Sequence, residues 1–390
     1  MEKFDCIVIG AGPAGSTMAY RMALEGAKVL LLDKAQFPRD KPCGGGISVR
    51  AGLELPIDPG PVVERGVDSL ELSFRGGRAF RRGGARQLAS LTQRRRLDHF
   101  LIEQATAAGA EFREGAGVSE ASENGARVNG EWIGAELLIG ADGANGSTAR
   151  YLGLSHTPTY GVAFEGNLAC QAAELGRWPS TVVIELGTVP GGYCWIFPKG
   201  DHLNIGVGGW EQTGPMLRSY LKEFCRQRGF EYSSLRDLRG YRLPGRQPGA
   251  RLSCGRAALI GDAAGLVDPL AGDGMYAAFL SSRLATEAAM KLLAGQETDL
   301  DSYGQLLVSE FGRMFAFAWN AKIALDRFPR LSLAAVLSPP GWRTLENMLR
   351  GEIREPERER GIPGLAVRGF ERVVNQLGWP GAEHRAEATT

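Results

Sequence analysis

The sequence predicts a mixed α/β protein (α+β overall) with a parallel sheet, an antiparallel sheet and C-terminal helices. Continuous apolar runs at 6–9, 29–32 and 257–260 are typical of parallel strands that are buried on both faces. Alternating apolar and polar residues across 161–209 favour antiparallel strands. An apolar-rich pattern across 303–328 predicts a helix. With 390 residues, the chain is long enough for two domains.

The first predicted strand leads into a glycine-rich turn and a helix. Gly10 permits the tight turn, Gly12 lets a pyrophosphate approach the backbone, and Gly15 lets the helix pack closely on the strand. Asp33 closes the second strand, where a carboxylate can accept hydrogen bonds from ribose hydroxyls. This Rossmann-type pattern predicts a dinucleotide site without distinguishing FAD from NAD(P), and its alternative is a glycine turn without a ligand. The predicted contacts here are Gly10, Gly12, Ala14, Gly15, Asp33 and Lys34.

Bulk properties exclude several classes of protein. A net charge of +1 gives no reason to expect a nucleic acid partner. The six cysteines include no CxxC pair, which leaves a metal site without support and favours free thiols in a reducing cytoplasm. The N-terminus runs directly into the first strand, so no signal peptide is expected. No apolar run reaches the roughly 18 residues that cross a bilayer.

A loop at 35–46 follows the ribose-binding strand and ends in Cys43-Gly44-Gly45-Gly46. Consecutive glycines remove side-chain bulk and permit unusual φ angles. The loop therefore either lets a ligand ring lie against the backbone, which we favour, or is a flexible surface segment.

The helix expected from about 94 to 108 begins at Arg94, which could reach cofactor phosphates or ribityl oxygens. Arg95 and Arg96 could do the same, or could form a solvated basic face. Because the helix follows a predicted hairpin at 67–80, which carries Gly76-Gly77, it returns the chain to the first domain.

Two further strands deliver an aspartate into a loop. Asp142 follows the buried strand 135–139, at the sheet edge where ligands of open α/β sheets bind, although Asp-Gly is also a common turn. Asp262 follows the strand 256–260, and a helix expected at 275–293 comes after it. The N-terminus of that helix favours negative charge in the loop.

In this order, the motifs resemble the FAD-dependent group typified by p-hydroxybenzoate hydroxylase, over about residues 4–290. The resemblance implies one FAD, with the second aspartate on the ribityl chain and the following helix N-terminus facing the flavin. It adds Cys43, Gly44, Arg94, Asp142, Gly261, Asp262, Gly272, Gly274 and Met275 to the predicted cofactor contacts.

Two stretches resemble the geranylgeranyl reductases within that group. These are Pro42-Cys43-Gly44-Gly45-Gly46, and Tyr193-Cys194-Trp195-Ile196-Phe197-Pro198. Such enzymes saturate isolated C=C bonds of polyprenyl chains, with hydride from flavin N5 on one carbon and a proton on the other. The resemblance implies Cys43, Tyr193 and Trp195 as candidate catalytic residues. It implies Gly45, Gly46, Tyr193, Trp195, Phe197 and Pro269 as substrate contacts.

Alternatives remain for several of these residues. Cys43 could be a proton donor, a redox-sensitive thiol or a structural thiol. Tyr193, Trp195 and Phe197 could instead be sheet core, which for Phe197 alone is the favoured interpretation. Asp33 and Asp273 depart from the family, where Glu is frequent. After Tyr303 no family motif is found, and the aromatic residues there could be core or the wall of a pocket for a long apolar substrate.

The predicted organisation interleaves two domains. FAD-binding segments span 1–66, 91–155 and 246–300. A hairpin at 67–90 and an antiparallel sheet at 156–245 form the substrate domain. Residues 301–390 form a helical region, charged at 352–361 and frayed at 379–390.

The resemblance predicts a cytoplasmic FAD-dependent oxidoreductase that acts on a polyprenyl lipid, quinone or chlorin-type substrate, with peripheral membrane contact where the substrate is a lipid. The electron donor stays open between NAD(P)H and reduced ferredoxin. A flavin monooxygenase or halogenase is the alternative enzyme, although Tyr193 and Phe197 depart from the related halogenase motif. A non-catalytic prenyl-lipid carrier is the alternative of another class, and the two aspartate loops argue against it.

Overall fold

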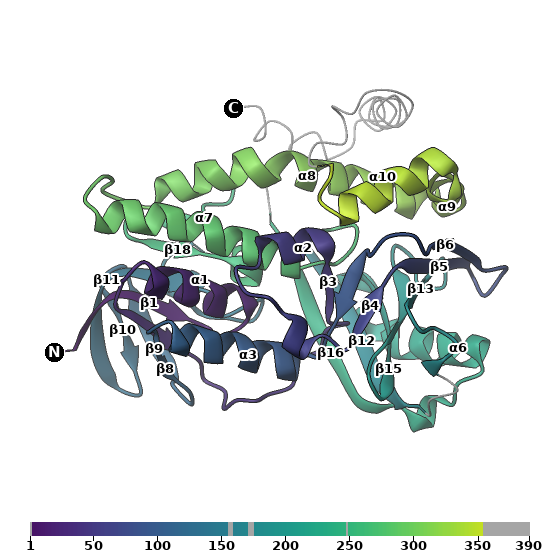
Figure 1. Cartoon of the computed structure of the whole chain (residues 1–390), viewed down its shortest axis with the longest axis horizontal. Helices are drawn as coiled ribbons and strands as arrows, with labels where there is room; N and C mark the ends of the chain where they lie inside the picture. Colours follow the sequence, from purple (N-terminus) through teal and green to yellow (C-terminus); the bar gives the residue numbers. More distant parts are fainter. Residues whose placement is uncertain (1, 155–158, 171–174, 247–248, 354–390) are drawn as a thin grey trace.

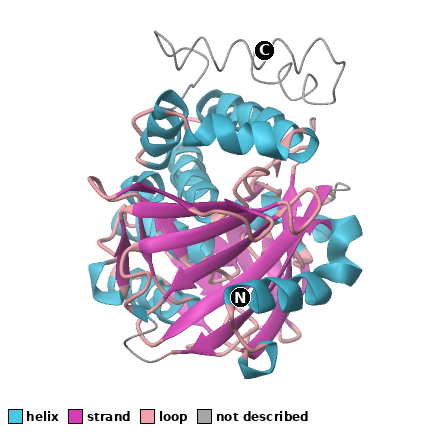
Figure 2. Ribbon diagram, turned by 90° about the vertical axis from the view of Figure 1, so that its right-hand side faces the viewer, coloured by secondary structure: helices cyan, strands magenta, loops and turns pink. Residues whose placement is uncertain are grey.

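The computed structural model describes residues 2–154, 159–170, 175–246 and 249–353 (Figure 1). Two sheets lie side by side, and helices cover them along one long edge of the molecule. Seen from the side that carries the second sheet, one group of helices lies above the strands, and further helices lie beside and below them (Figure 2). The charged segment expected at 352–361 falls almost wholly outside the described residues, as does the frayed end expected at 379–390.

The first sheet has the predicted parallel centre. Its strand order is β17-β18-β11-β1-β2-β8, and the contacts between β18, β11, β1, β2 and β8 are all parallel. The antiparallel strands β10 and β9 extend it beside β11. The bounds are β1 Lys3–Ile9, β2 Val29–Leu32, β8 Glu111–Arg113, β9 Val118–Ser122, β10 Gly125–Val128, β11 Glu131–Gly140, β17 Ser253–Cys254 and β18 Ala257–Leu259.

Helices pack on this sheet through the largest apolar core of the described chain. The helix α1 (Pro13–Leu24) contacts both α3 (Arg94–Ala107) and α7 (Met275–Leu293). The short helices α2 (Val49–Glu54) and α4 (Thr148–Tyr151) lie at the edges of this layer. The sequence predicted α7 at its observed bounds, because the loop that follows the preceding strand ends at Gly274.

The second sheet is antiparallel except at one contact. Its order is β16-β12-β15-β14-β13-β5-β6, and β5 runs parallel to β13. The predicted hairpin is confirmed as the pair β5–β6, which forms the edge of this sheet. The bounds are β5 Ser69–Phe74, β6 Phe80–Gly83, β12 Thr159–Ala169, β13 Thr181–Leu186, β14 Tyr193–Pro198, β15 His202–Trp210 and β16 Arg236–Gly245. The helix α6 (Leu217–Arg228) packs on β12 and β15.

A three-stranded antiparallel sheet connects the two layers. It has the order β3-β7-β4, with β3 Gly46–Ser48, β4 Arg65–Val67 and β7 Ala89–Leu91. The predicted glycine loop therefore runs directly into β3, which fixes its far end beside the second sheet.

The C-terminal helices lie across both sheets. They are α8 (Asp301–Arg327), α9 (Pro329–Leu337) and α10 (Pro339–Leu349). The aromatic residues of α8 divide between both predicted roles. Phe311 and Phe315 are buried in the main core, whereas Phe317 and Trp319 line a cavity.

Candidate active site

A cavity of about 750 Å³ lies where the two sheets and the C-terminal helices meet. The structure brings most of the predicted site residues to its wall. Those that line it are Gly12, Ala14, Cys43, Gly44, Gly45, Gly46, Arg94, Tyr193, Trp195, Phe197, Asp262, Pro269, Gly272, Gly274 and Met275. Those that do not line it are Gly10, Gly15, Asp33, Lys34, Asp142 and Gly261.

The glycine turn has no room for side chains at its inner positions. Gly10 has φ +108°, and a Cβ on Gly15 would lie 1.9 Å from the carbonyl oxygen of Gly10. A Cβ on Gly12, in contrast, would meet only a guanidinium nitrogen of Arg94, at 3.8 Å. The backbone of the turn is therefore open toward the cavity at Gly12, as a phosphate-binding turn requires.

The carboxylate of Asp33 lies beside this turn. It accepts hydrogen bonds from the backbone N–H of Ala11 at 2.9 Å and of Ala35 at 2.8 Å. These bonds tie the end of β2 to the turn and hold the carboxylate at the turn's edge. The neighbouring Lys34 is exposed.

Arg94 is a buried cation at the cavity wall. Its guanidinium donates to both oxygens of Asp98 at 2.7 Å, and Arg39 approaches the same carboxylate at 3.1 Å. Burial alone would lower the pKa of Arg94, but the charge and the hydrogen bonds of Asp98, with smaller contributions from Cys43 and Tyr241, together outweigh burial and raise it. The position of Arg94 therefore holds a permanent positive charge near Gly12.

The next two arginines of α3 lie on the protein surface. Arg95 and Arg96 are exposed and approach Asp40 and Glu64 at 3.8 and 3.0 Å. Of the two interpretations of this pair, the structure favours the solvated basic face.

The first of the two aspartate loops shapes the site from outside the cavity. The carboxylate of Asp142 accepts from the backbone N–H of Ser147 and from the N–H and hydroxyl of Thr148, at 2.8–2.9 Å. It therefore caps α4, and its neighbour Gly143 lines the cavity instead. A direct cofactor contact by Asp142 stays a prediction.

The second aspartate loop faces the cavity directly. Gly261 has φ +58° and packs on Ala14, which brings the loop against α1. Asp262 accepts a hydrogen bond from the hydroxyl of Tyr241 at 3.2 Å, and Lys41 lies 3.9 Å from the same oxygen. Burial lowers the pKa of Lys41.

The helix α7 begins in the same loop. Asp273 accepts from the backbone N–H of Met275 at 2.9 Å, while Gly274 remains on the cavity wall. The helix N-terminus thus lies at the cavity, as the sequence predicted.

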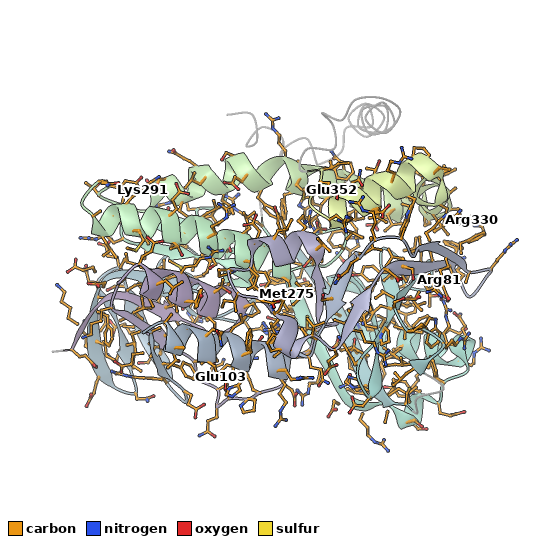
Figure 3. All side chains as sticks on the ribbon, viewed as in Figure 1. Arg81, Glu103, Met275, Lys291, Arg330 and Glu352 are labelled. Carbon is orange, nitrogen blue, oxygen red and sulfur yellow. The ribbon has the colours of Figure 1, made fainter. Side chains whose placement is uncertain are left out.

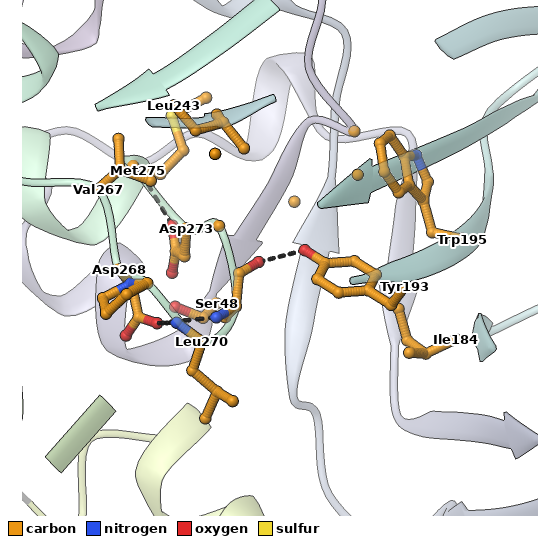
Figure 4. Close-up of a pocket in the computed structure, with 18 of the residues that line it drawn as sticks. Ser48, Ile184, Tyr193, Trp195, Leu243, Val267, Asp268, Leu270, Asp273 and Met275 are labelled. Carbon is orange, nitrogen blue, oxygen red and sulfur yellow. Dashed lines mark hydrogen bonds between the residues drawn. The ribbon is translucent and has the colours of Figure 1, made fainter. Parts of the chain in front are cut away.

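Three aromatic residues at alternate positions of β14 share one face of the strand. The centroid distances are 5.9 Å for Tyr193–Trp195 and 6.5 Å for Trp195–Phe197. The hydroxyl of Tyr193 donates to the carbonyl of Ala271, and burial raises its pKa. Figure 4 shows Tyr193 and Trp195 facing the loop that carries Asp268 and Asp273.

The sheet leaves space for these rings at specific glycines. A Cβ on Gly206, the partner of Trp195 on β15, would lie 2.1 Å from the indole. The indole N–H donates to Asn204 at 2.8 Å. Phe197 packs against Gly44, where a Cβ would lie 2.7 Å from the ring. The aromatic motif and the glycine loop are thus complementary in shape.

Two buried ionisable residues hold the Cys43 loop in place. Glu165 of β12 accepts from the backbone N–H of Cys43 at 2.7 Å. Lys199 donates to the carbonyl of Gly44 and, at 2.9 Å, to that of Thr92. Burial raises the pKa of Glu165 and lowers the pKa of Lys199 to about 8.

Sequence reasoning missed these two residues, together with Lys41 and Tyr241. A signal existed for Glu165, which is the one charged residue in the predicted strand 162–165. Lys199 directly follows the aromatic motif. Nothing local distinguishes Tyr241, because its partner Asp262 is 21 residues away.

Beyond the aromatic residues, the cavity continues as an apolar slot. Its walls come from β5 and β13 on one side and from α8, α9 and α10 on the other. The slot is lined by Leu70, Leu72, Val182, Ile184, Leu186, Phe317, Trp319, Leu325, Leu333, Val336, Leu345, Met348 and Leu349.

The polar part of the cavity has the donors and acceptors that a flavin dinucleotide needs. It presents the open turn at Gly12, the cation of Arg94, the carboxylate of Asp262 and the N-terminus of α7. These groups match a diphosphate and a hydroxylated chain.

Comparison with known proteins agrees with this arrangement. Residues 3–192 match the FAD binding domain family, and residues 171–238 match the geranylgeranyl reductase catalytic domain family. Geranylgeranyl diphosphate reductase of Rhodobacter capsulatus is 32% identical over 80% of this chain and 82% of its own length. Menaquinone reductase of Mycobacterium tuberculosis is 32% identical over 84% and 85%. Digeranylgeranylglycerophospholipid reductase 1 of Methanopyrus kandleri is 31% identical over 89% and 97%.

Solved structures share the fold. A geranylgeranyl bacteriochlorophyll reductase-like protein from Thermoplasma acidophilum has a TM-score of 0.74 at 22% identity, covering 96% of each chain. A flavin-dependent brominase has a TM-score of 0.76 at 17% identity, covering 96% of this chain and 99% of its own. Because reductases and halogenases both have this fold, the fold alone does not select the reaction.

Proposed function

The chain belongs to the geranylgeranyl reductase family of FAD-dependent oxidoreductases, and we propose that it saturates isolated C=C bonds of a polyprenyl chain. The observation that carries this proposal is the single cavity that joins a polar dinucleotide-binding end to a long apolar slot. A prenyl chain has no polar groups for recognition, so such a slot must bind it through shape and apolar contact.

The polar end is where the residues of this chain would hold FAD. The turn at Gly12 and the cation of Arg94 would hold the diphosphate, and Asp33 would meet the adenosine ribose. Asp262 would accept hydrogen bonds from the ribityl hydroxyls. When bound and reduced, FAD supplies the hydride that one alkene carbon receives.

The second alkene carbon needs a proton, for which we propose Sγ of Cys43. The thiol belongs to the loop that Glu165 and Lys199 hold, and the backbone N–H of Gly45 donates to this sulfur at 3.3 Å. That contact fixes the position of the sulfur beside the glycine backbone. The buried carboxyl of Glu165 accepts a hydrogen bond from the backbone N–H of Cys43, and this bond keeps the sulfur at the cavity wall.

The aromatic residues of β14 orient the alkene and exclude water. Tyr193, Trp195 and Phe197 form an apolar wall between the polar end and the slot. Water near the reacting carbons would compete with the alkene for the proton, so a dry wall favours productive transfer. Gly45, Gly46 and Pro269 complete this wall from the opposite loops.

The relatives differ in the molecule that carries the prenyl chain. Their names specify a diphosphate, a quinone and a glycerophospholipid. We propose a polyprenyl lipid or quinone for this chain, with a chlorin-type substrate as the remaining member of the class. Electrons would come from NAD(P)H or reduced ferredoxin.

Among the described residues, none of the helices is long and apolar enough to cross a bilayer. We keep the expectation of a cytoplasmic protein that meets a lipid substrate by peripheral contact.

The test is an anaerobic single turnover. The holoenzyme is reduced with dithionite and mixed with geranylgeranyl diphosphate or a menaquinol, whose reduced ring takes no electrons from the flavin, and flavin absorbance and product mass are followed. The proposal predicts reoxidation of the flavin together with a gain of two hydrogens per double bond. Flavin that stays reduced with every polyprenyl compound, but reacts with O₂ to give hydroxylated or halogenated product, would overturn it.

A further inference from the structure

An arginine-rich surface lies at the outer end of the apolar slot. We define the arginine rim as Arg75, Arg78, Arg81 and Arg82 of the β5–β6 hairpin with Arg330 of α9. All five side chains are exposed. Figure 3 shows Arg81 and Arg330 at the same end of the molecule.

Contacts join the two elements of the rim into one surface. The guanidinium carbons of Arg75 and Arg330 lie 5.5 and 5.3 Å from the centroid of the same ring, Phe74. Arg82 donates to the carbonyl of Leu337, at the end of α9. The rim is therefore continuous from the hairpin to the helix.

Among the described residues, no carboxylate pairs with the positive charge of the rim. Residues 72–93 hold five arginines and no Asp or Glu, and residues 327–345 hold three arginines and again no acid. Within the part of the chain that the structure describes, none of the five rim arginines is within ion-pair distance of a carboxylate. In a chain of net charge +1, this is a strong local asymmetry.

Exposed apolar side chains lie within the same surface. Phe328 is 47% exposed and Leu331 is 69% exposed, two of the five large apolar side chains that the described chain exposes most. Phe328 and Leu331 share a groove with Arg75 and Arg330. Apolar side chains among arginines are the composition of interfacial membrane-binding surfaces.

The rim is also next to the slot. Leu333 and Val336, on the helix that presents Leu331 and Arg330, line the main cavity. The helix α9 therefore lines the slot with one face and exposes Arg330 and Leu331 on the other.

From these observations we propose that the arginine rim, with Phe328 and Leu331, docks the protein on an anionic phospholipid surface at the slot end formed by α9. This inference rests on the proposed function, because docking on a bilayer is useful to an enzyme whose prenyl lipid substrate must leave the bilayer to enter the slot. We assign a bilayer to this surface, and not the phosphate of one substrate. The five arginines come from two elements and surround exposed apolar groups, whereas a single phosphate would need a closed pocket.

The test uses purified holoenzyme and needs no turnover, so its failure is distinct from failure of the proposed reaction. Cosedimentation is measured with phosphatidylglycerol–phosphatidylcholine vesicles and with phosphatidylcholine vesicles, at low and high salt. We expect binding to the anionic vesicles alone, weakened by salt. R78E/R330E should reduce that binding by roughly 25-fold or more, since each arginine near such a surface contributes about fivefold.

Matched variants keep the result interpretable. R236E/R239E makes the same charge change on exposed positions of β16 and should bind like the wild type. L331S should weaken binding without a charge change, and R78Q/R330Q should give a smaller loss than the double reversal. FAD content of each variant checks that its fold is intact.

Three results would overturn the proposal. The first is equal vesicle binding by R78E/R330E and R236E/R239E, or none by the wild type. The second is absent vesicle binding with pyrophosphate binding that R78E/R330E abolishes, which would assign the rim to a single phosphate group. The third is a concentration-dependent dimer that L331S dissociates, which would assign the surface to a second copy of this chain.

Discussion

The two ends of the cavity are built in opposite ways. At the polar end, backbone geometry and paired charges do the positioning: Gly15 has no space for a Cβ, and Arg94 is fixed by two bonds to Asp98. At the apolar end, side-chain surface alone shapes the slot, from strands β5 and β13 and from helices α8–α10.

This difference predicts which residues of the cavity tolerate substitution and which do not. A group that holds a charge or a backbone turn has few substitutes, so changes at the polar end should remove FAD. Apolar side chains of different size are exchangeable at modest cost, so changes at the other end should alter which chain binds.

The largest expected effect is that of Asp262→Ala. Removing this carboxylate leaves the hydroxyl of Tyr241 and the ammonium of Lys41 without their shared partner and removes an acceptor for the cofactor. We expect FAD affinity to fall on the order of 100-fold. Equilibrium dialysis and the absorbance of the purified protein measure this. Asp262→Asn, which keeps the shape but not the charge, should lose less FAD affinity. Stoichiometric FAD in purified Asp262→Ala would show that this loop is not part of the FAD site.

A change at Lys199 tests whether a buried ionisable group holds the Cys43 loop, which lies between the polar and the apolar end of the cavity. Its pKa is lowered to about 8 from 10.5, so between pH 8 and 10.5 the unfolded state binds a proton that the folded state does not. Stability contributed by Lys199 therefore rises with pH across this window, by about 3 kcal/mol in total.

Lys199→Met should remove that gain. Urea denaturation at pH 7.5 and 9.5 would show the wild type gaining stability relative to the variant, while the exposed control Lys222→Met follows the wild type. A constant difference between wild type and Lys199→Met at both pH values would mean that Lys199 is not held as the structure shows.

A bulky side chain in the slot should change substrate choice without touching the cofactor. Val336→Trp places an indole in the cavity, and overpacking of this kind typically weakens binding roughly tenfold or more. We expect KM to rise for a geranylgeranyl chain and to change little for a geranyl chain, with normal FAD content. Ala334→Trp adds the same group to the exposed face of α9 and serves as the control. Equal effects on both chain lengths would contradict the assigned slot.

The smallest effect should come from Tyr193→Phe, at the boundary of the two ends. The variant loses the hydrogen bond to the carbonyl of Ala271 and keeps the ring. We expect about a fivefold loss in kcat/KM, the value of one neutral hydrogen bond. FAD should be retained, and Tyr232→Phe, on the far side of the second sheet, should have no effect. A loss above 100-fold would make the hydroxyl itself catalytic.

The same contrast explains what the sequence could predict. The turn that Gly10, Gly12, Gly15 and Asp33 form depends on short-range geometry, so their spacing was sufficient to predict the turn, while their cofactor contacts stay predictions. The position of Asp142 after a strand predicts a ligand contact, which stays a prediction, but it does not reveal that one carboxylate oxygen caps α4, because a strand–Asp-Gly pattern does not specify where the side chain points.

Residues that depend on distant partners were not predictable. Lys199 holds Gly44 and Thr92, and neither is near it in sequence. The helix α8 was predicted correctly, yet its period could not tell Phe311, which is core, from Phe317, which lines the cavity. That distinction depends on which neighbour covers each face.

The central claim is that the prenyl slot and the FAD site are one cavity, and a binding titration on the oxidised holoenzyme tests it most directly. A geranylgeranyl compound is added while the flavin absorbance and fluorescence are recorded. We predict a saturable change in the flavin spectrum, shifted to roughly tenfold higher ligand concentration in Val336→Trp and unchanged in Ala334→Trp. A chain that binds without any change in the flavin spectrum, or with equal affinity in Val336→Trp, would contradict the account.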